Sequence, residues 1–316
     1  MVDVEKLRAI EGGDTVDIEY LGCLLWSTVS DVLRIPIEEL RQRLDFLGLE
    51  RFMPRKINPR DAFRRVTKSV EIYRTPYGDN TYLNLLVRDV KFREKEVVRQ
   101  LVREVVDGKN ARLEYTPVIE FKMEKEGGLS TTPLVNKLNH IETELMDRIP
   151  SLQEDACKYY DGTHIRHMFR VMLQECGPVS VRPNGGVVFI PQRYAEMTEK
   201  IKELSRALNE YEGNVRMWSI PVIDATEHRE MIEESLEEQV LTSSQGLIQD
   251  MKTIIESPEK SITVKGVQGY ADRVRKLKDL VEEYEESLEF QATRARENLE
   301  LARQITMKLM EDITEE

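Results

Sequence analysis

The sequence predicts a helix-rich α+β protein: an N-terminal β-α-α-β-β-β module, a middle helical module with a β-hairpin, and a C-terminal antiparallel helical hairpin of coiled-coil type. Three observations predict this class. Apolar residues recur at helical spacing along much of the chain, apolar and polar residues alternate at 111–124, and a heptad pattern runs through 270–309. A chain of 316 residues exceeds what one core usually organises, so we expect three domains, at 1–125, 130–224 and 225–316.

The first domain begins with β-branched and aromatic residues at 16–32, which predict one or two strands. Two helices are expected next. The first runs from Pro36 to about Leu47, and the second begins at Asn58, a capping residue that a proline follows. The remaining elements are the strands of an antiparallel sheet, at about 81–92, 95–106 and 111–124.

The middle domain follows a linker at 125–132. The pair Thr132-Pro133 predicts the start of a helix that ends near Arg148. Two further helices are expected at 151–160 and 163–176.

A β-hairpin is expected at 179–191, where Asn184-Gly185 separates two short apolar runs. Helices followed by a hairpin are typical of winged-helix proteins, although the apolar second run favours a core strand instead. A helix that Pro191 begins and Gly213 ends, and then a strand at 215–223, complete the domain.

The C-terminal domain is expected to consist of two helices. Asp224 caps the first, which ends at Ser257-Pro258, and the second runs from about Gln268 to Ile313. The second helix is longer, so an antiparallel hairpin leaves its tip for a further partner. Its expected coiled-coil seam alternates spacings of four and three and consists of Tyr270, Val274, Leu277, Val281, Tyr284, Leu288, Ala295, Ala302, Ile305 and Leu309.

Composition and charge limit the partners and the compartment. The net charge of −12 argues against a protein that coats nucleic acid or anionic membrane over its whole surface. Three cysteines, an odd and sparse set, indicate reduced thiols. The N-terminus lacks the apolar core of a signal peptide, and no uncharged stretch is long enough to span a bilayer. We therefore expect a cytoplasmic protein without a membrane partner.

A basic cluster at 51–68 stands out in this acidic chain. It contains Arg51, Arg55, Lys56, Arg60, Arg64, Arg65 and Lys68. Three of its cations share one helix face at spacings of four, which suits a row of phosphates. Nucleic-acid or phosphate binding is one interpretation, and a solvated face or a docking surface for the acidic C-terminal helices is the other. A second set of candidates for nucleic-acid binding comes from the winged-helix interpretation, namely His164, Arg166, Arg170 and Arg182.

Two catalytic or metal-binding arrangements are worth weighing. Cys157, His164, His167 and Cys176 carry the ligand types of zinc. However, nine residues separate His167 from Cys176, about 13 Å along a straight helix, so one ion cannot reach both. Asp107, Glu120 and Lys122 match the carboxylate and lysine pattern of magnesium-dependent nucleases. A turn at Asp107 and an alternating strand at 111–124 explain the same residues without a metal.

Searches for other motifs find no phosphate-binding loop, dinucleotide fingerprint, nucleophile elbow or zinc-protease helix. The sequence therefore predicts no catalytic residue, no cofactor and no metal ligand.

Two segments are similar to a known family. WSTVSDVLRIPIEELRQRLDFLGLERFMPRKINPRDAFRRV (26–66) and VSVRPNGGVVFIPQRY (179–194) resemble the N-terminal and middle patterns of uncharacterised prokaryotic, plasmid and phage proteins. The resemblance implies a phage or mobile-element origin. It implies no activity and no functional residues.

We conclude from the sequence that this is a non-enzymatic binding or scaffold protein. It is expected to associate with itself or to dock another protein through its C-terminal hairpin. The alternative is a nucleic-acid-binding protein that uses residues 51–68, and a weaker alternative is a magnesium-dependent nuclease.

Overall fold

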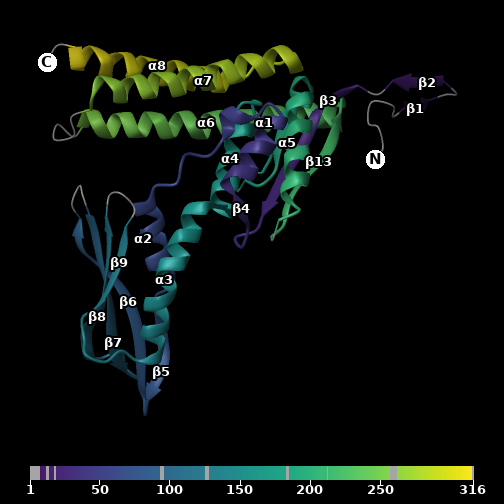
Figure 1. Ribbon diagram of the computed structural model, residues 1–316. Coiled ribbons are helices and arrows are strands. Elements are labelled where there is room, and N and C mark those ends of the chain that lie inside the picture. The colour runs from purple at the N-terminus through teal and green to yellow at the C-terminus, as the bar shows by residue number, and fades with distance from the viewer. Residues whose placement is uncertain are drawn as a thin grey trace. The chain divides into compact units, whose positions relative to one another are not determined.

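The computed structural model describes residues 8–11, 14–17, 19–92, 96–124, 128–182, 185–211, 213–256 and 262–314. These residues form a mixed α+β structure with helices at the C-terminus, which confirms the predicted fold class (Figure 1). The chain divides into two compact units. The bundle unit comprises Met1–Ser30, Met168–Glu210 and Asn214–Glu316, and the sheet unit comprises Asp31–His167 and Tyr211–Gly213.

An antiparallel sheet dominates the sheet unit. Its five strands within the described residues lie in chain order: β5 (Ile72–Gly78), β6 (Thr81–Phe92), β7 (Glu96–Asp107), β8 (Arg112–Glu124) and β9 (Leu129–Pro133). The three central strands confirm the predicted ones to within one residue. The sequence assigns the segment of β9 to a linker. It is a strand because β8 offers a backbone edge, along which Thr131 lies opposite Phe121.

Two helices cover one face of this sheet (Figure 1). α2 (Pro59–Ser69) begins where predicted, since the Asn58 side chain accepts a hydrogen bond from the backbone N–H of Arg60 at 3.0 Å. α3 (His140–Lys158) lies beside it. The core between helices and sheet includes Phe63, Val66, Leu85, Leu101, Ile119, Phe121, Leu145 and Ile149.

α3 starts later than predicted and does not break. Asn139 and Glu142 form a capping box in which each side chain accepts a hydrogen bond of 2.9 Å from the other's backbone N–H. The expected start at 132–133 is therefore wrong. The expected division into two helices is also wrong, because α3 continues through Pro150 while the adjacent Ile149 is fully buried in the core.

A short ribbon and further helices complete the sheet unit. β4 (Arg34–Pro36) pairs with β10 (Tyr159–Asp161). α1 (Ile37–Phe46) follows β4 and confirms the first predicted helix, and a short 3-10 helix follows at Glu50–Phe52. α4 (Gly162–Gln174) begins directly after β10 and passes into the bundle unit at Met168.

The described part of the bundle unit contains a four-stranded antiparallel sheet. Its order is β11 (Val179–Ser180), β12 (Val188–Pro191), β3 (Tyr20–Val29) and β13 (Val215–Ile223). Val179 lies opposite Phe189, which confirms the hairpin, while Asn184 of its expected turn lies outside the described residues. The hairpin is thus part of a wider sheet rather than a two-stranded wing.

β3 corrects the predicted N-terminal module. The sequence places this strand with those at 81–124, but it pairs with β12 and β13. There its residue Leu24 lies opposite the apolar residues Phe189 of β12 and Ile220 of β13. A 3-10 turn (Gln192–Tyr194) leads into α5 (Ala195–Leu208), which packs on β13 and buries Ile201, Leu204 and Leu208. β1 (Arg8–Glu11) and β2 (Asp14–Asp17) form a separate antiparallel pair.

The C-terminal region has three helices among its described residues: α6 (Thr226–Glu256), α7 (Val264–Leu288) and α8 (Thr293–Thr314). The predicted continuous final helix is wrong. The chain reverses at Glu289, whose φ of 57° and ψ of 39° are left-handed. The Glu285 carboxylate then accepts a hydrogen bond from the backbone N–H of Ala292 at 2.8 Å and holds the turn.

The three C-terminal helices pack pairwise, and they lie side by side in Figure 1. Residues of the expected seam do face the interior of this helix bundle, but they are divided between two helices instead of lying on one. Val274, Val281, Tyr284 and Leu288 are buried on α7, and Ala295, Ala302 and Leu309 are buried on α8. Tyr270, Leu277 and Ile305 are partly buried against the same clusters. None of the described helices is long and apolar enough to cross a membrane.

Candidate functional site

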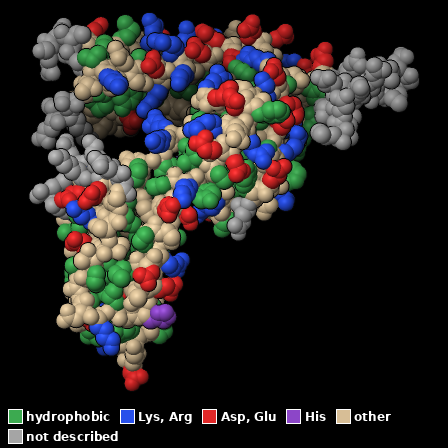
Figure 2. Space-filling view, in the orientation of Figure 1, with side chains coloured by type: hydrophobic (Ala, Val, Ile, Leu, Met, Phe, Trp, Pro, Cys, Tyr) green, Lys and Arg blue, Asp and Glu red, His purple; other side chains and the backbone are tan. Residues whose placement is uncertain are grey.

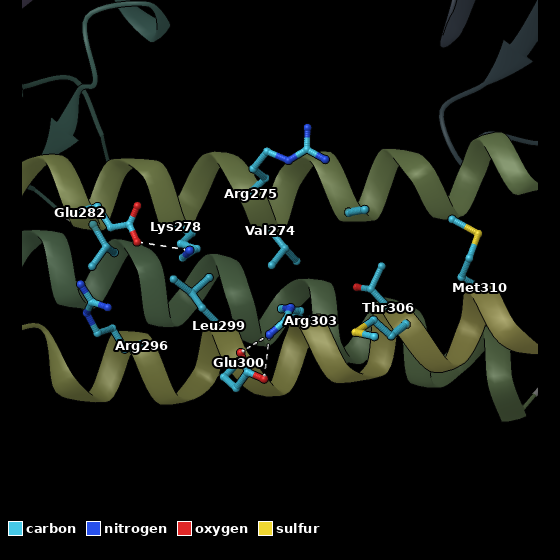
Figure 3. Close-up of a pocket in the computed structure, with 13 residues that line it drawn as sticks. Val274, Arg275, Lys278, Glu282, Arg296, Leu299, Glu300, Arg303, Thr306 and Met310 are labelled. Carbon is cyan, nitrogen blue, oxygen red and sulfur yellow. Dashed lines mark hydrogen bonds and ion pairs between the residues drawn. The ribbon is translucent and has the colours of Figure 1, made fainter.

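A groove of about 780 Å³ runs between α7 and α8 (Figure 3). Its floor is apolar, because Val274, Val281 and Leu299 lie at its base and are each at least nine-tenths buried. The reversal at Glu289 creates this groove by folding α8 back along α7, so a continuous final helix would have no such site.

One end of the groove is lined by flexible apolar side chains. Ala271 contributes from α7, and Met307 and Met310 contribute from α8. The Thr306 hydroxyl donates a hydrogen bond to the Ala302 carbonyl at 2.8 Å, so this polar group already has a partner within α8. Met307 is half-exposed, at 51%. Methionine adapts its shape to different apolar partners, so this end suits a bulky apolar side chain.

Cations occupy the middle of the groove. In Figure 3, Lys278 and Arg303 point into the space between the two helices, and Arg275 projects from the rim. Lys278 Nζ lies 3.3 Å from Glu282 and Arg303 Nη1 lies 3.2 Å from Glu300. All four side chains are about half exposed. Exposed pairs of this kind contribute about 0–1 kcal/mol each, so both cations can exchange partners at little cost.

The end nearest the turn is more firmly held. Arg296 Nε donates to the Glu285 carboxylate at 2.9 Å, and this hydrogen bond lowers the pKa of Glu285. Arg229 fixes the turn from α6: it donates to both oxygens of Asp224, at 2.6 and 2.7 Å, and to the carbonyl of Leu288 at 2.9 Å. Side chains of both signs are interspersed over the surface of α7 and α8 in Figure 2, so the cationic middle is a local feature.

The basic cluster at 51–68 lies on α2 and the segment before it, and acids neutralise much of it. Arg65 Nη1 bonds to Asp161 at 2.8 Å, and Lys68 pairs with Glu71 in a hydrogen bond that raises the pKa of the lysine. Arg64 lies 3.9 Å from Asp61. The guanidinium of Arg51 stacks over Phe52, 4.7 Å from its ring centroid, while Arg55 and Lys56 are exposed and Arg60 is half-buried.

Asp161 brings two of the predicted residues together. Its carboxylate accepts from Arg65 and from His164 Nδ1 at 2.7 Å, and the hydrogen bond with His164 is the main cause that lowers the pKa of Asp161. Arg166 bonds to Asp31 at 2.6 Å. Arg170, one turn after Arg166 on α4, and Arg182 belong to the bundle unit.

A hollow of about 220 Å³ beside Asp161 was not predicted. It is lined by Arg34, Arg65, Ser69, Tyr159 and Asp161, among others. Sequence reasoning missed Arg34 and Asp161 because only the pairing of β4 with β10 places them opposite each other, across a separation of more than a hundred residues.

The three residues of the nuclease pattern are not brought together. Asp107 Oδ1 accepts from the backbone N–H groups of Lys109 and Ala111, both at 2.8 Å, and so holds its own turn. Glu120 lies opposite Gln100 on β7, and seven residues of that strand correspond to about 23 Å from Asp107. Lys122 bonds to Glu96 at 3.3 Å.

The residues that sequence analysis weighed for zinc form no cluster of metal-ligand type. Within the described ranges, no group of three or more histidine, cysteine or acidic side chains could hold a metal ion. Cys23, Cys157 and Cys176 are free, and burial raises the pKa of Cys176 to about 11. Burial also raises the pKa of Cys23 and of Cys157, so all three thiols are protonated near neutral pH, unlike nucleophilic cysteines.

The chain matches a known protein family. Residues 20–315 match a family of unknown function (DUF6744), which confirms the resemblance to an uncharacterised family. No curated protein and no solved structure matches the chain.

Proposed function

The chain belongs to this family of unknown function, DUF6744, and we propose from its own geometry that it is a non-enzymatic docking protein. In this proposal, the groove between α7 and α8 binds a helix of a partner protein. The observation that carries it is the combination of an apolar floor at Val274, Val281 and Leu299 with a volume of about 780 Å³.

A helix fits this groove better than other occupants do. The groove lies between two neighbouring helices with α6 on their other side, so an added helix would complete a four-helix arrangement. Helices in such bundles insert side chains into the spaces between their neighbours. A small ligand would be covered on one side only, whereas tight small-molecule sites bury most of the ligand.

A second copy of this chain is a poorer occupant than another protein. Two identical grooves placed face to face would bring Lys278 and Arg303 against the same cations of the other copy. Both grooves would also be concave, so neither copy would offer a protruding helix to fill the groove of the other. Self-association through this groove would appear as a doubled mass in light scattering, and that result would contradict the proposal of a separate partner.

The test uses the full-length chain, immobilised and screened against displayed helical peptides that share an apolar seam and have randomised flanks. We expect peptides whose binding is lost in Ala271→Trp, which fills the groove, and in Met307→Asp. Leu301→Asp is the matched control, because Leu301 is an exposed apolar residue of α8 that does not line the groove. Recovery of no binders, or equal loss in all three variants, would reject the proposal.

A second candidate is nucleic-acid binding by the sheet unit. Its support is the exposed pair Arg55 and Lys56 beside the cations of α2, because such rows bind phosphates. Labelled single- and double-stranded DNA and RNA would be titrated across a salt series. This candidate requires salt-sensitive binding that Arg60→Glu with Arg64→Glu abolishes. The control Lys109→Glu with Arg148→Glu makes the same charge change elsewhere on that unit and should retain it.

We further propose that the protein acts in the cytoplasm and comes from a phage or mobile element. Three free cysteines support the first statement, because thiols persist in reducing compartments. The resemblance of 26–66 and 179–194 to phage and plasmid proteins supports the second. Fractionation of the native host, with detection of the full-length chain, tests the location.

A further inference from the structure

We propose that the groove between α7 and α8 selects an acidic amphipathic helix. This inference rests on the proposed docking function and adds the chemistry of the partner. It follows from where the charged and apolar side chains lie along the groove. The cations determine where the bound helix carries acidic residues, and the apolar end determines where it carries an apolar residue.

Two cations face the groove although the whole chain is acidic (Figure 3). The groove lining contains the cations Arg275, Lys278, Arg296 and Arg303. Asp272 and Glu285 pair with Arg275 and Arg296, so Lys278 and Arg303 are the two that face the space between the helices (Figure 3). The chain as a whole has a net charge of −12. An acidic partner would therefore be repelled by much of the molecule and attracted at the groove, which favours binding in one place.

The cations are available to a partner because their present pairs are weak. Lys278 and Arg303 come from opposite walls and point into the same space (Figure 3). Their pairs with Glu282 and Glu300 are exposed pairs within single helices. A partner carboxylate between the two walls would contact both cations at once and would be partly shielded from water, which strengthens the attraction.

The apolar end sets the spacing that the partner needs. Ala271 and Met310 lie at this end, and Lys278 lies seven residues from Ala271 along α7, about 10 Å or two turns. A bound helix thus needs a bulky apolar residue at one position and acidic residues about seven positions away. The partner helix is therefore expected to carry an apolar seam, with a pair of acidic residues beside it about two turns away from the bulky apolar residue.

The probes are two synthetic helical peptides of about 18 residues, long enough at about 27 Å to span the groove. Both carry the same leucine seam. The acidic peptide has glutamates at the flanking positions and the basic peptide has lysines there. Binding to the full-length chain would be measured by fluorescence anisotropy. We expect the acidic peptide to bind at least about tenfold more tightly, since one close charge pair of about 1.4 kcal/mol has this effect.

Charge reversal identifies the surface responsible. Lys278→Glu with Arg303→Glu should weaken the acidic peptide at least about tenfold and should strengthen the basic one. Lys276→Glu with Lys308→Glu is the control. It changes the net charge of the same two helices equally, at exposed positions that do not line the groove, and it should leave the preference intact.

The outcomes separate this inference from the function on which it rests. Equal binding of both peptides, lost in Ala271→Trp, would overturn the acidic preference and leave docking intact. Binding of neither peptide would overturn both. Oleate is a further probe, because its chain and carboxylate match the same groove. Oleate binding that Arg303→Glu abolishes, without peptide binding, would reject a helix as the ligand.

Discussion

The ion pair between Arg103 and Glu142 shows how one residue couples sheet and helix in the sheet unit. Arg103 donates from Nε and Nη2 to the two oxygens of Glu142, at 2.7 and 2.6 Å. Glu142 is fully buried and also closes the capping box at Asn139. The arginine therefore both neutralises a buried carboxylate and orients the group that starts α3.

Replacing Arg103 by methionine should be severely destabilising. The substitution retains much of the apolar stem but leaves Glu142 as a buried charge without its partner, which costs about 3–5 kcal/mol. Urea unfolding at neutral pH measures the change. Arg148→Met is the control, because Arg148 and Glu144 form an exposed pair on the same helix, and it should cost less than about 1 kcal/mol. Similar losses in both variants would contradict this account.

Asp161 should make stability depend on pH at the acidic end. Its folded pKa lies below the ordinary 3.8, chiefly because of His164. A depressed pKa stabilises the fold above the unfolded value, and that contribution disappears as the pH falls through the folded value. The stability difference between wild type and Asp161→Asn should thus shrink as the pH falls below about 4. A difference that grows as the pH falls below 4 would contradict this assignment.

At the scale of single elements, the turn between α7 and α8 has a residue of unfavourable type. Glu289 adopts a left-handed conformation, which costs a side chain about 1–2 kcal/mol relative to glycine. Glu289→Gly should therefore raise the free energy of unfolding by about 0.5–1 kcal/mol after the entropy of glycine is included. Glu297→Gly, at an exposed position inside α8, should lower it by about 1 kcal/mol. Thermal unfolding of both variants measures whether stability rises in the first and falls in the second. A loss of stability in both would contradict backbone strain at Glu289.

The same turn explains why the sequence predicts one long helix. Leu288, Ala295, Ala302 and Leu309 stand seven residues apart, so the heptad register continues through the reversal. The spacing reports which residues are buried, and most of the predicted seam is buried. It carries no information about Glu289, because glutamate rarely ends a helix in this conformation.

The other elements could be predicted where local residue patterns determine them, and not where long-range pairing does. The central strands β6, β7 and β8 follow from local alternation and turn residues, so they could be predicted almost to the residue. β9 could not, because its short polar segment is a strand only through pairing with β8. The sequence predicts the start of α3 at Thr132-Pro133, whereas the reciprocal hydrogen bonds between Asn139 and Glu142 place it at His140.

At the scale of the whole molecule, both candidate sites require contacts that no local pattern records. The groove needs α8 to fold back on α7, and the hollow at Asp161 needs β4 to meet β10. The sequence predicts a C-terminal docking region and includes Arg65 and His164 among the candidate binding residues. It does not predict the groove in that region or the contacts of these two residues with Asp161. The division into a bundle unit and a sheet unit is likewise a matter of long-range pairing, since β3 joins strands far along the chain.

Docking in the groove should stabilise one unit and leave the other unchanged. A ligand at about 100 times its dissociation constant stabilises the fold that binds it by about 2.7 kcal/mol. Hydrogen exchange resolves this effect by region, because local opening sets the protection of each segment. With the acidic peptide we expect slower exchange in α7 and α8, which form the groove, and unchanged exchange in β6, β7 and β8. The Lys278→Glu with Arg303→Glu variant should show neither change. Slower exchange in the sheet unit as well would mean that binding couples the two units, and unchanged exchange in α7 and α8 would exclude the groove as the site.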